Sequence, residues 1–248
     1  MTAALVVLVL IGGWEAFVRA GGVDPLILPP PSDVLQALWD DRDLLAPDLW
    51  TTTYEVLLGL AAATVAGAAL GVAMHLFPGL RRALRPLVIG SQAVPVPVIA
   101  PLVILVLGFG LAPKVLLVAL VCFFPITINL YDGLRGADPD ARRLLRSLQA
   151  TRWQTLRLVE APAALPSAFT GLKVAAAVAV IGAVFAEWAG AESGLGRVLI
   201  TANGQLETAR AFAATLLLFL LAIALYAACA LLERRVVDWT PRTHSGGS

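Results

Sequence analysis

Several long, continuous apolar runs constrain this sequence more than any other feature. A membrane-spanning helix needs about 20 mostly apolar residues, because the hydrocarbon core is about 30 Å thick and each helical residue rises about 1.5 Å. Strands of a membrane barrel would instead alternate apolar and polar residues. The sequence therefore predicts an all-α membrane protein with about six transmembrane helices, at Ala3–Val18, Thr52–Phe77, Leu87–Leu111, Pro113–Tyr131, Ser167–Ala189 and Thr208–Leu232.

The composition supports a membrane environment. Hydrophobic residues make up 59% of the chain and charged residues only 14%, whereas a soluble domain is about 25% charged. A single soluble core buries only part of such a surface, so we expect the lipid bilayer to cover the rest. The net charge of +1 gives no basic balance that would favour nucleic acid. Both cysteines lie inside apolar runs and form no Cys/His cluster, so we expect no metal site.

The first run, Ala3–Val18, has two interpretations. A signal peptide would carry a basic segment before the apolar run and a small-residue cleavage site after it, and neither pattern is present. We therefore interpret this run as the first transmembrane helix.

Most basic residues fall on one side of the predicted helices, and cytoplasmic loops are rich in Lys and Arg. Five of the 18 basic residues lie on the other side, and Lys173 lies near the start of the fifth helix. The remaining twelve are Arg81, Arg82, Arg85, Arg135, Arg142, Arg143, Arg146, Arg152, Arg157, Arg234, Arg235 and Arg242. The bias predicts cytoplasmic N and C termini. It also predicts a first helix with an external loop (1–50), a main transmembrane domain (51–235) with a long cytoplasmic connection (132–166), and a cytoplasmic tail (236–248).

Prolines and polar residues inside the runs are candidates for a solute pathway. Closely spaced prolines in the third predicted helix indicate either a broken helix that lines a pathway or a packed kink without a transport role. Buried polar groups in membrane helices are costly and tend to be functional, although Asn129 has the alternative of bonding a neighbouring helix and Glu187 that of an ion pair or helix cap. The candidate pathway residues are Gln92, Pro95, Pro97, Asn129 and Glu187.

The connection 132–166 has the pattern of two amphipathic helices. Asp138 is suited to cap the first helix with Pro139 in its first turn, and Thr151 is suited to cap the second. Arginines surround an apolar stripe on the first helix, formed by Leu144, Leu145 and Leu148. Basic amphipathic helices rest on lipid headgroups or dock into soluble partners, and the spacing leaves both interpretations open.

Within this connection, Arg143-Leu144-Leu145 precedes Gln149, and Val159-Glu160-Ala161-Pro162 begins ten residues beyond Gln149. This spacing resembles the cytoplasmic signature of ABC importer permeases of the binding-protein-dependent inner-membrane class: Glu-Ala-Ala, then Gly, then Ile-x-Leu-Pro. Gln149 stands at the glycine position, where a positive φ suits Gly better than Gln. Further similarity, to the nitrate, sulfonate, taurine and pyrimidine-precursor branch, lies in Leu28–Pro31, Gln92–Pro101, Gly108–Gly110, Ala186–Gly190 and Gly194–Gly196.

The resemblance implies the channel-forming permease subunit of an ATP-driven ABC importer in the inner membrane. It implies a small solute, with a thiamine-pyrimidine-like precursor favoured by the Glu187-Trp188 neighbourhood and sulfonate, taurine or nitrate as alternatives. The implied partners are two cytoplasmic ATP-binding subunits that hold ATP and Mg, a second copy of this permease, and an extracytoplasmic solute-binding protein. It places a coupling helix around Ser147–Trp153, with the coupling residues Arg146, Ser147, Leu148, Gln149, Ala150, Thr151, Arg152 and Trp153.

The residues themselves favour transport over catalysis on this chain. A phosphate loop needs Gly-x4-Gly-Lys-Ser/Thr, but the two lysines, Lys114 and Lys173, follow Pro and Leu. The sequence contains neither HExxH nor GxSxG. The main alternative is a secondary transporter, which usually has paired intramembrane charges or inverted repeats. The glutamates in the apolar regions instead fall near predicted helix ends, which argues against a proton relay.

Overall fold

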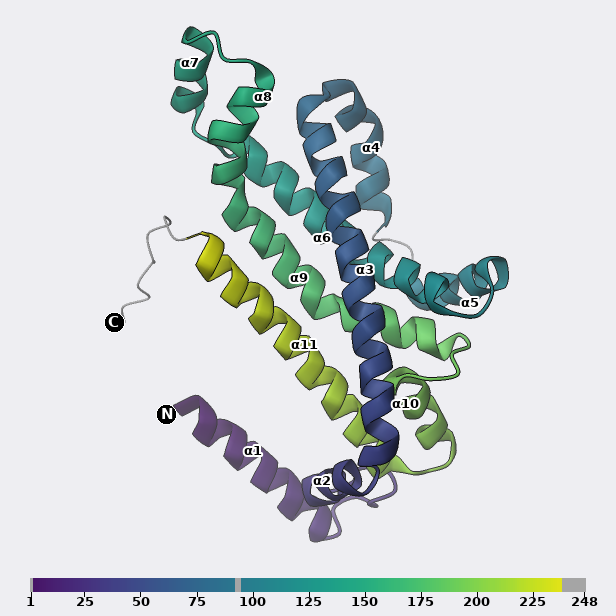
Figure 1. The fold of residues 1–248 in the computed structure, drawn as a ribbon. Helices are drawn as coiled ribbons and strands as arrows, with labels where there is room; N and C mark the ends of the chain where they lie inside the picture. Colours follow the sequence, from purple (N-terminus) through teal and green to yellow (C-terminus); the bar gives the residue numbers. More distant parts are fainter. Residues whose placement is uncertain (1, 92–94, 238–248) are drawn as a thin grey trace. The chain divides into compact units, whose positions relative to one another are not determined.

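The computed structural model describes residues 2–91 and 95–237, and these residues form helices, turns and connections without a strand. The element order is visible in Figure 1. The helices are α1 (Thr2–Arg19), α2 (Pro31–Asp40), α3 (Arg42–Leu76), α4 (Pro78–Gly90), α5 (Val96–Leu107), α6 (Leu111–Arg135), α7 (Pro139–Ser147), α8 (Arg152–Thr155), a π-helical segment (Leu156–Glu160), α9 (Ala161–Trp188), α10 (Leu195–Gly204) and α11 (Thr208–Val236).

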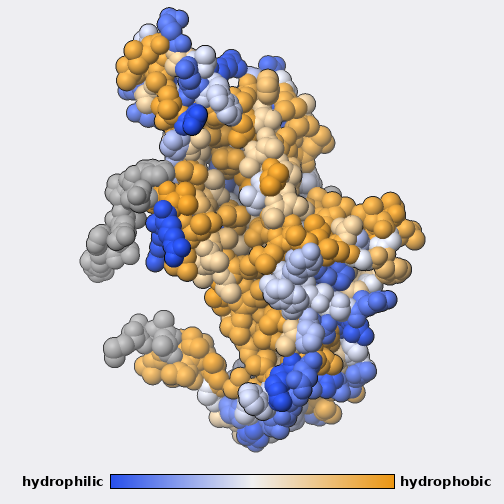
Figure 2. All heavy atoms as spheres, in the orientation of Figure 1, coloured by the Kyte–Doolittle hydropathy of each residue, from blue (hydrophilic) through white to orange (hydrophobic). Residues whose placement is uncertain are grey.

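Four helical runs of the described residues are long and apolar enough to cross a membrane. They are α3, α6, the continuous run Arg152–Trp188 that ends with α9, and α11, while α5 is a shorter apolar helix. On the face drawn in Figure 2, apolar residues cover much of the long helices, and hydrophilic residues gather around α7, α8 and α2. The all-α membrane class is therefore confirmed, and the count of six spanning helices stays a prediction.

The predicted third helix, 87–111, is not continuous. Helix α4 ends at Gly90, and α5 begins at Val96 after Pro95, whose extended backbone precedes the first helical turn. Proline has no N–H to donate and is tolerated at the start of a helix, so Pro95 and Pro97 begin α5 rather than bend its middle. Gln92 lies outside the described residues.

The apolar runs did not predict where one helix begins, nor the presence of another. Helix α3 begins at Arg42 rather than near Thr52, because the polar residues before the apolar run continue the same helix. Glu55 therefore lies within a helix and not near its end. Helix α10 has a Gly-rich start and no long apolar run, so the sequence did not predict it.

The chain divides into two compact units. Unit 1 comprises Met1–Gly59, Pro95–Val118 and Ala179–Ala222, and unit 2 comprises Leu60–Val94, Ala119–Val178 and Ile223–Ser248. In unit 1, Ala100, Leu117 and Ala186 form a core cluster, contributed by α5, α6 and α9. In unit 2, one core cluster contains Met74, Val88 and Tyr131, and a second contains Leu134, Leu156 and Ala164.

Small residues bring helices of unit 2 close together. A Cβ at Gly67 would lie 3.0 Å from the Thr127 hydroxyl of α6, and one at Gly133 would lie 2.7 Å from the Cβ of Ser167. Membrane helices associate through such close backbone approaches, because water supplies no hydrophobic force between them. These glycines therefore fix the packing of α3, α6 and α9 within this unit.

Candidate functional site

The predicted cytoplasmic connection forms a helix pair in unit 2. The side chain of Asp138 accepts a hydrogen bond from the Asp140 amide at 2.9 Å, with Pro139 as the first helical residue of α7. This confirms the cap predicted from the sequence. Arg142 Nη2 donates to the carbonyl oxygens of Leu134 and Arg135 at 2.6 and 2.9 Å. The first helix of the pair is therefore tied to the end of α6.

Helix α7 ends in a Schellman turn at the position of the signature glycine. Gln149 adopts φ +61°, and its amide donates to the Arg146 carbonyl at 3.0 Å. The Ala150 amide donates to the Leu145 carbonyl, also at 3.0 Å, which completes the motif. The left-handed backbone is thus present although glutamine replaces glycine. Ser147–Trp153 is consequently not one helix. The segment where the resemblance implied a single helix is a corner between α7 and α8, here taken as residues 146–153.

Helix α8 starts with a capping box. Thr151 Oγ1 accepts from the Gln154 amide at 3.2 Å, and the Thr151 amide donates to Gln154 Oε1 at 2.7 Å. Two orphan amides at the helix start are satisfied by this reciprocal pair. The cap predicted at Thr151 is confirmed, and both sides of the corner are held by local hydrogen bonds.

We expect Gln149→Gly to stabilise this corner. A left-handed backbone costs an L-residue about 1–2 kcal/mol, part of which is offset by the larger unfolded-state entropy of glycine. The net gain should be up to about 1 kcal/mol, seen as slower amide hydrogen exchange over residues 146–152. Ser147→Gly is the matched control, because Ser147 lies in the helical last turn of α7. It should speed exchange, since glycine weakens a helix by about 0.5 kcal/mol relative to serine. Faster exchange in Gln149→Gly would contradict the strain argument.

The corner presents apolar and basic side chains outward. Neither α7 nor α8 contains a buried residue. Leu148 is 67% exposed and Trp153 is 63% exposed, and arginines flank both. All eight predicted coupling residues lie on this corner, and all but the half-buried Ala150 are exposed. Contiguous exposed apolar residues with a polar rim are typical of a protein interaction surface.

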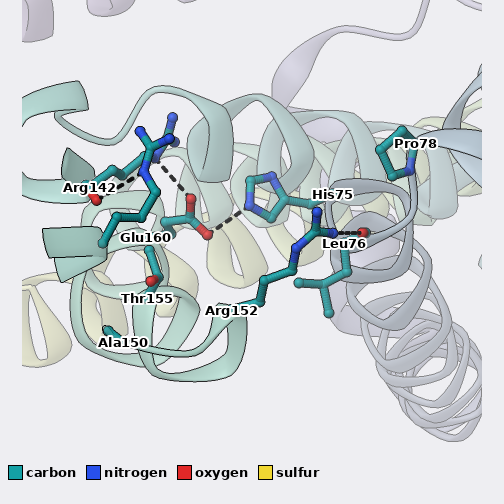
Figure 3. Close-up of a pocket in the computed structure, with 9 residues that line it drawn as sticks. His75, Leu76, Pro78, Arg142, Ala150, Arg152, Thr155 and Glu160 are labelled. Atoms are coloured by element: carbon teal, nitrogen blue, oxygen red, sulfur yellow. Dashed lines mark hydrogen bonds and ion pairs between the residues drawn. The ribbon is translucent and has the colours of Figure 1, made fainter. Parts of the chain in front are cut away.

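A buried carboxylate joins the helix pair to α3. Glu160, in the π-helical segment, is 7% exposed. Its Oε2 lies 2.7 Å from Nε2 of His75, and its Oε1 lies 2.8 Å from Nε of Arg142. Figure 3 shows these side chains converging, with Arg152 donating to the Leu76 carbonyl at 3.2 Å. In the sequence, Glu160 stood out only as part of the signature, and its role in joining these helices was not predicted.

Glu187, a predicted pathway residue, caps a helix within unit 1. The side chain is 2% exposed. Its Oε1 accepts from Thr52 Oγ1 at 2.7 Å, and its Oε2 accepts from the Gly196 amide at 2.5 Å. The Leu195 amide donates to Thr52 Oγ1 at 2.9 Å, and the Gly194 amide donates to Asp48 Oδ1 at 2.7 Å. Three consecutive amides at the start of α10 thus find acceptors, as a buried helix start requires.

A buried ion pair lies in the same unit. Lys114 Nζ is 2.6 Å from Glu55 Oε1, and both side chains are at least nine-tenths buried. This pair was not predicted from the sequence, because Glu55 was expected near a helix end. Asp48, Thr52 and Glu55 recur at the spacing of one helix face in α3, and that pattern was the signal available. Such a pair is also expected of a secondary transporter. The ion pair therefore does not distinguish the two classes of transporter, and the family decides between them.

Three other predicted pathway residues lie in the described part of the chain. Asn129, in unit 2, donates from Nδ2 to the Pro125 carbonyl of its own helix at 2.8 Å. A Cβ at Gly171 would lie 2.8 Å from the Asn129 Cβ, so α9 passes close to this amide. Pro95 and Pro97 are exposed residues of unit 1. A role of these residues in a solute pathway stays a prediction.

Comparison with known proteins decides the family. A model of the binding-protein-dependent transport system inner membrane component family matches residues 58–238. This chain belongs to that family. Members of the family are transport permeases, so the permease is a multi-pass protein of the inner membrane, and the resemblance seen in the sequence is confirmed.

Curated relatives of the permease match it over nearly their whole length. The formylaminopyrimidine transport permease ThiX of Halalkalibacterium halodurans is 35% identical, over 91% of this chain and 90% of its own. The riboflavin transport system permease RibX of Chloroflexus aurantiacus is 36% identical, over 91% and 85%. The taurine transport system permease TauC of Escherichia coli is 31% identical, over 93% and 86%.

Solved structures share the fold of the permease. An inward-facing structure of the MetNI methionine ABC transporter contains a chain with a TM-score of 0.70 and 19% identity, covering 79% of this chain and 98% of that one. A chain of an amino acid ABC transporter gives a TM-score of 0.66 at 16% identity, over 81% and 97%. The family match and the curated relatives set aside the secondary-transporter alternative in favour of an ABC importer permease.

Proposed function

We propose that this permease forms the solute channel of an ATP-driven importer and that its α7–α8 corner docks into a cytoplasmic ATP-binding subunit. The observation behind this proposal is the exposed corner. Exposed apolar side chains lie among arginines there, on a turn held by a Schellman motif and a capping box. ATP and Mg belong to the partner subunit, because this chain lacks a phosphate loop.

The distribution of basic residues supports a cytoplasmic position for the corner. The arginines expected in the cytoplasm, as far as the structure describes them, all belong to unit 2, which also contains the corner. The five expected on the external side belong to unit 1, namely Arg19, Arg42, Lys114, Arg197 and Arg210. The positive-inside rule then favours a cytoplasmic position for these arginines and for the corner that carries several of them. On this basis we propose six membrane passages with both termini cytoplasmic.

Coupling requires the corner to make different contacts in two states of the partner, because a partner shifts an equilibrium only through differential binding. Two structural links would transmit such a movement from the corner to the long helices. Glu160 joins α3 through His75 and α7 through Arg142, and Arg142 also bonds the end of α6. A movement of the corner would therefore pull on α3, α6 and α9 together.

The assembly we propose has two copies of this permease, two ATP-binding subunits and an extracytoplasmic solute-binding protein. The proposed cargo is a small heteroaromatic solute. Relatives named for formylaminopyrimidine and riboflavin transport are 35% and 36% identical, compared with 31% for the taurine permease. Taurine, sulfonate or nitrate transport is the alternative. Glu187 gives no support to either cargo, because its carboxylate is occupied by the α10 cap. Pro95, Pro97 and Asn129 stay as proposed pathway residues.

Native mass spectrometry of the complex, purified gently through this subunit from its own host, tests the proposal. Two copies of this chain with two copies of an ATP-binding subunit are the expected composition, and a co-purified binding protein would lead to the cargo. A lone monomer or a homo-oligomer, under conditions that preserve other ABC importers, would contradict it.

A further inference from the structure

A cavity of about 400 Å³ opens beside the corner, within unit 2. The end of α3 and the start of α4 contribute one wall, and α7, the corner and the helical run after it contribute the other (Figure 3). Its lining residues are His75, Leu76, Pro78, Arg142, Arg146, Ala150, Arg152, Thr155 and Glu160. The cavity is therefore built partly from the proposed coupling residues.

The lining of this cavity has an excess of positive charge. Three guanidinium groups face a single carboxylate, Glu160, and that carboxylate is already paired with Arg142 and His75. Within residues 2–91 and 95–237, no carboxylate forms an ion pair with Arg146 or Arg152. Two guanidinium charges in the cavity lining thus have no acidic counterpart in the described chain.

Both of these arginines are anchored by one nitrogen and keep others for a ligand. Arg146 donates from Nε to the Arg142 carbonyl at 3.3 Å. Arg152 donates from Nη1 to the Leu76 carbonyl at 3.2 Å. A guanidinium carries five N–H donors in a planar fork that suits a carboxylate. Anchoring one nitrogen reduces the conformational entropy that a ligand must remove when it binds.

We propose that this cavity receives the carboxylate of an aspartate or glutamate side chain of the ATP-binding subunit, held between Arg146 and Arg152. The inference rests on the proposed docking of that subunit on the corner. The partner's carboxylate supplies the negative charge that the cavity lacks. Leu148 and Trp153 would exclude water around it, since both are exposed and each lies within two residues of one of these arginines in sequence. A charged pair surrounded by apolar contacts is the arrangement of a protein interface hot spot.

The test uses the full-length permease in nanodiscs and its own ATP-binding subunit. We expect Arg146→Glu and Arg152→Glu each to weaken the affinity for that subunit by about tenfold or more, with the larger effect at low salt. Arg143→Glu is the matched control. This substitution makes the same charge change on α7. The Arg143 side chain, however, is 73% exposed, pairs with Asp140 and does not line the cavity. An Asp→Arg or Glu→Arg replacement on the ATP-binding subunit should restore binding to Arg152→Glu.

A photo-crosslinker placed at Leu148 separates this inference from the proposed function. If the crosslinker captures the ATP-binding subunit while both reversals bind like Arg143→Glu, the acidic contact is wrong and docking stands. If it captures no ATP-binding subunit, the proposed function itself fails. If Arg152→Glu abolishes binding of inorganic phosphate to the permease but leaves the subunit affinity unchanged, the cavity is a phosphate site and the proposal is overturned.

Discussion

Leu148→Asp is expected to disconnect solute uptake from ATP hydrolysis. Leu148 ends α7 at the corner, is 67% exposed and has the position of an apolar anchor. An anchor of this kind typically contributes about 2 kcal/mol or more to an interface, and a carboxylate there would also have to be desolvated on docking. We expect the affinity for the ATP-binding subunit to fall about 30-fold or more. Reconstituted vesicles should then show ATP hydrolysis with little accompanying uptake.

Leu206→Asp is the matched control for this experiment. Leu206 is 66% exposed, has φ +61° at the end of α10, and belongs to unit 1. The substitution adds the same charge at an equally exposed leucine, so affinity for the ATP-binding subunit should stay within about twofold of the unmodified protein. Normal uptake by a well-expressed Leu148→Asp permease would show that the corner does not couple the two processes.

Among these substitutions, Glu187→Ala should lower the free energy of unfolding the most. It removes the acceptor for the Gly196 amide and the Thr52 hydroxyl, both in a buried site, and leaves a cavity. An unsatisfied buried donor costs about 1–3 kcal/mol, so two such donors and the cavity should lower the free energy of unfolding by about 3 kcal/mol. The thermal midpoint of the detergent-purified protein should fall by about 6–12 °C.

Two comparisons test whether the α10 cap causes this loss. Glu192→Ala makes the same change five residues later, in the loop after α9, where the side chain is exposed, and should leave the midpoint nearly unchanged. Gly194→Ala should lower the midpoint while Gly204→Ala should not. A Cβ at Gly194 would collide with the Glu187 carboxylate, whereas one at Gly204 has nothing within 4 Å. Equal midpoints for Glu187→Ala and Glu192→Ala would show that the cap does not stabilise the fold.

Local signals in the sequence predicted the corner well. Asp138 and Thr151 were identified as caps from residue type alone, and both caps are present. Such caps depend on residues a few positions apart, so no tertiary information is needed to find them. The signature spacing also marked Gln149 as a position of unusual backbone, and its φ of +61° agrees. The error was to place one coupling helix over Ser147–Trp153, as the resemblance implied, although the cap at Thr151 already marked the start of a second helix.

The polar clusters could not be predicted in the same way. Glu160 meets His75 across 85 positions, and Glu187 meets Thr52 across 135. When each of these residues is taken alone, its partner is unknown. Glu187 therefore fitted a solute pathway as readily as a helix cap. The pairing is decided by which helix faces meet, and side chains this far apart in sequence leave no periodic signal.

The amino-acid sequence alone was sufficient for the all-α membrane class, the basic bias of one side and the capped helix pair, because hydropathy and capping are properties of short segments. Tertiary structure alone decided how buried polar groups are satisfied. It gave α10 three side-chain acceptors, paired Lys114 with Glu55, and placed Arg146 and Arg152 in the lining of a basic cavity. Away from water each buried polar group needs a partner, and only the packing of distant helices determines which partner it finds.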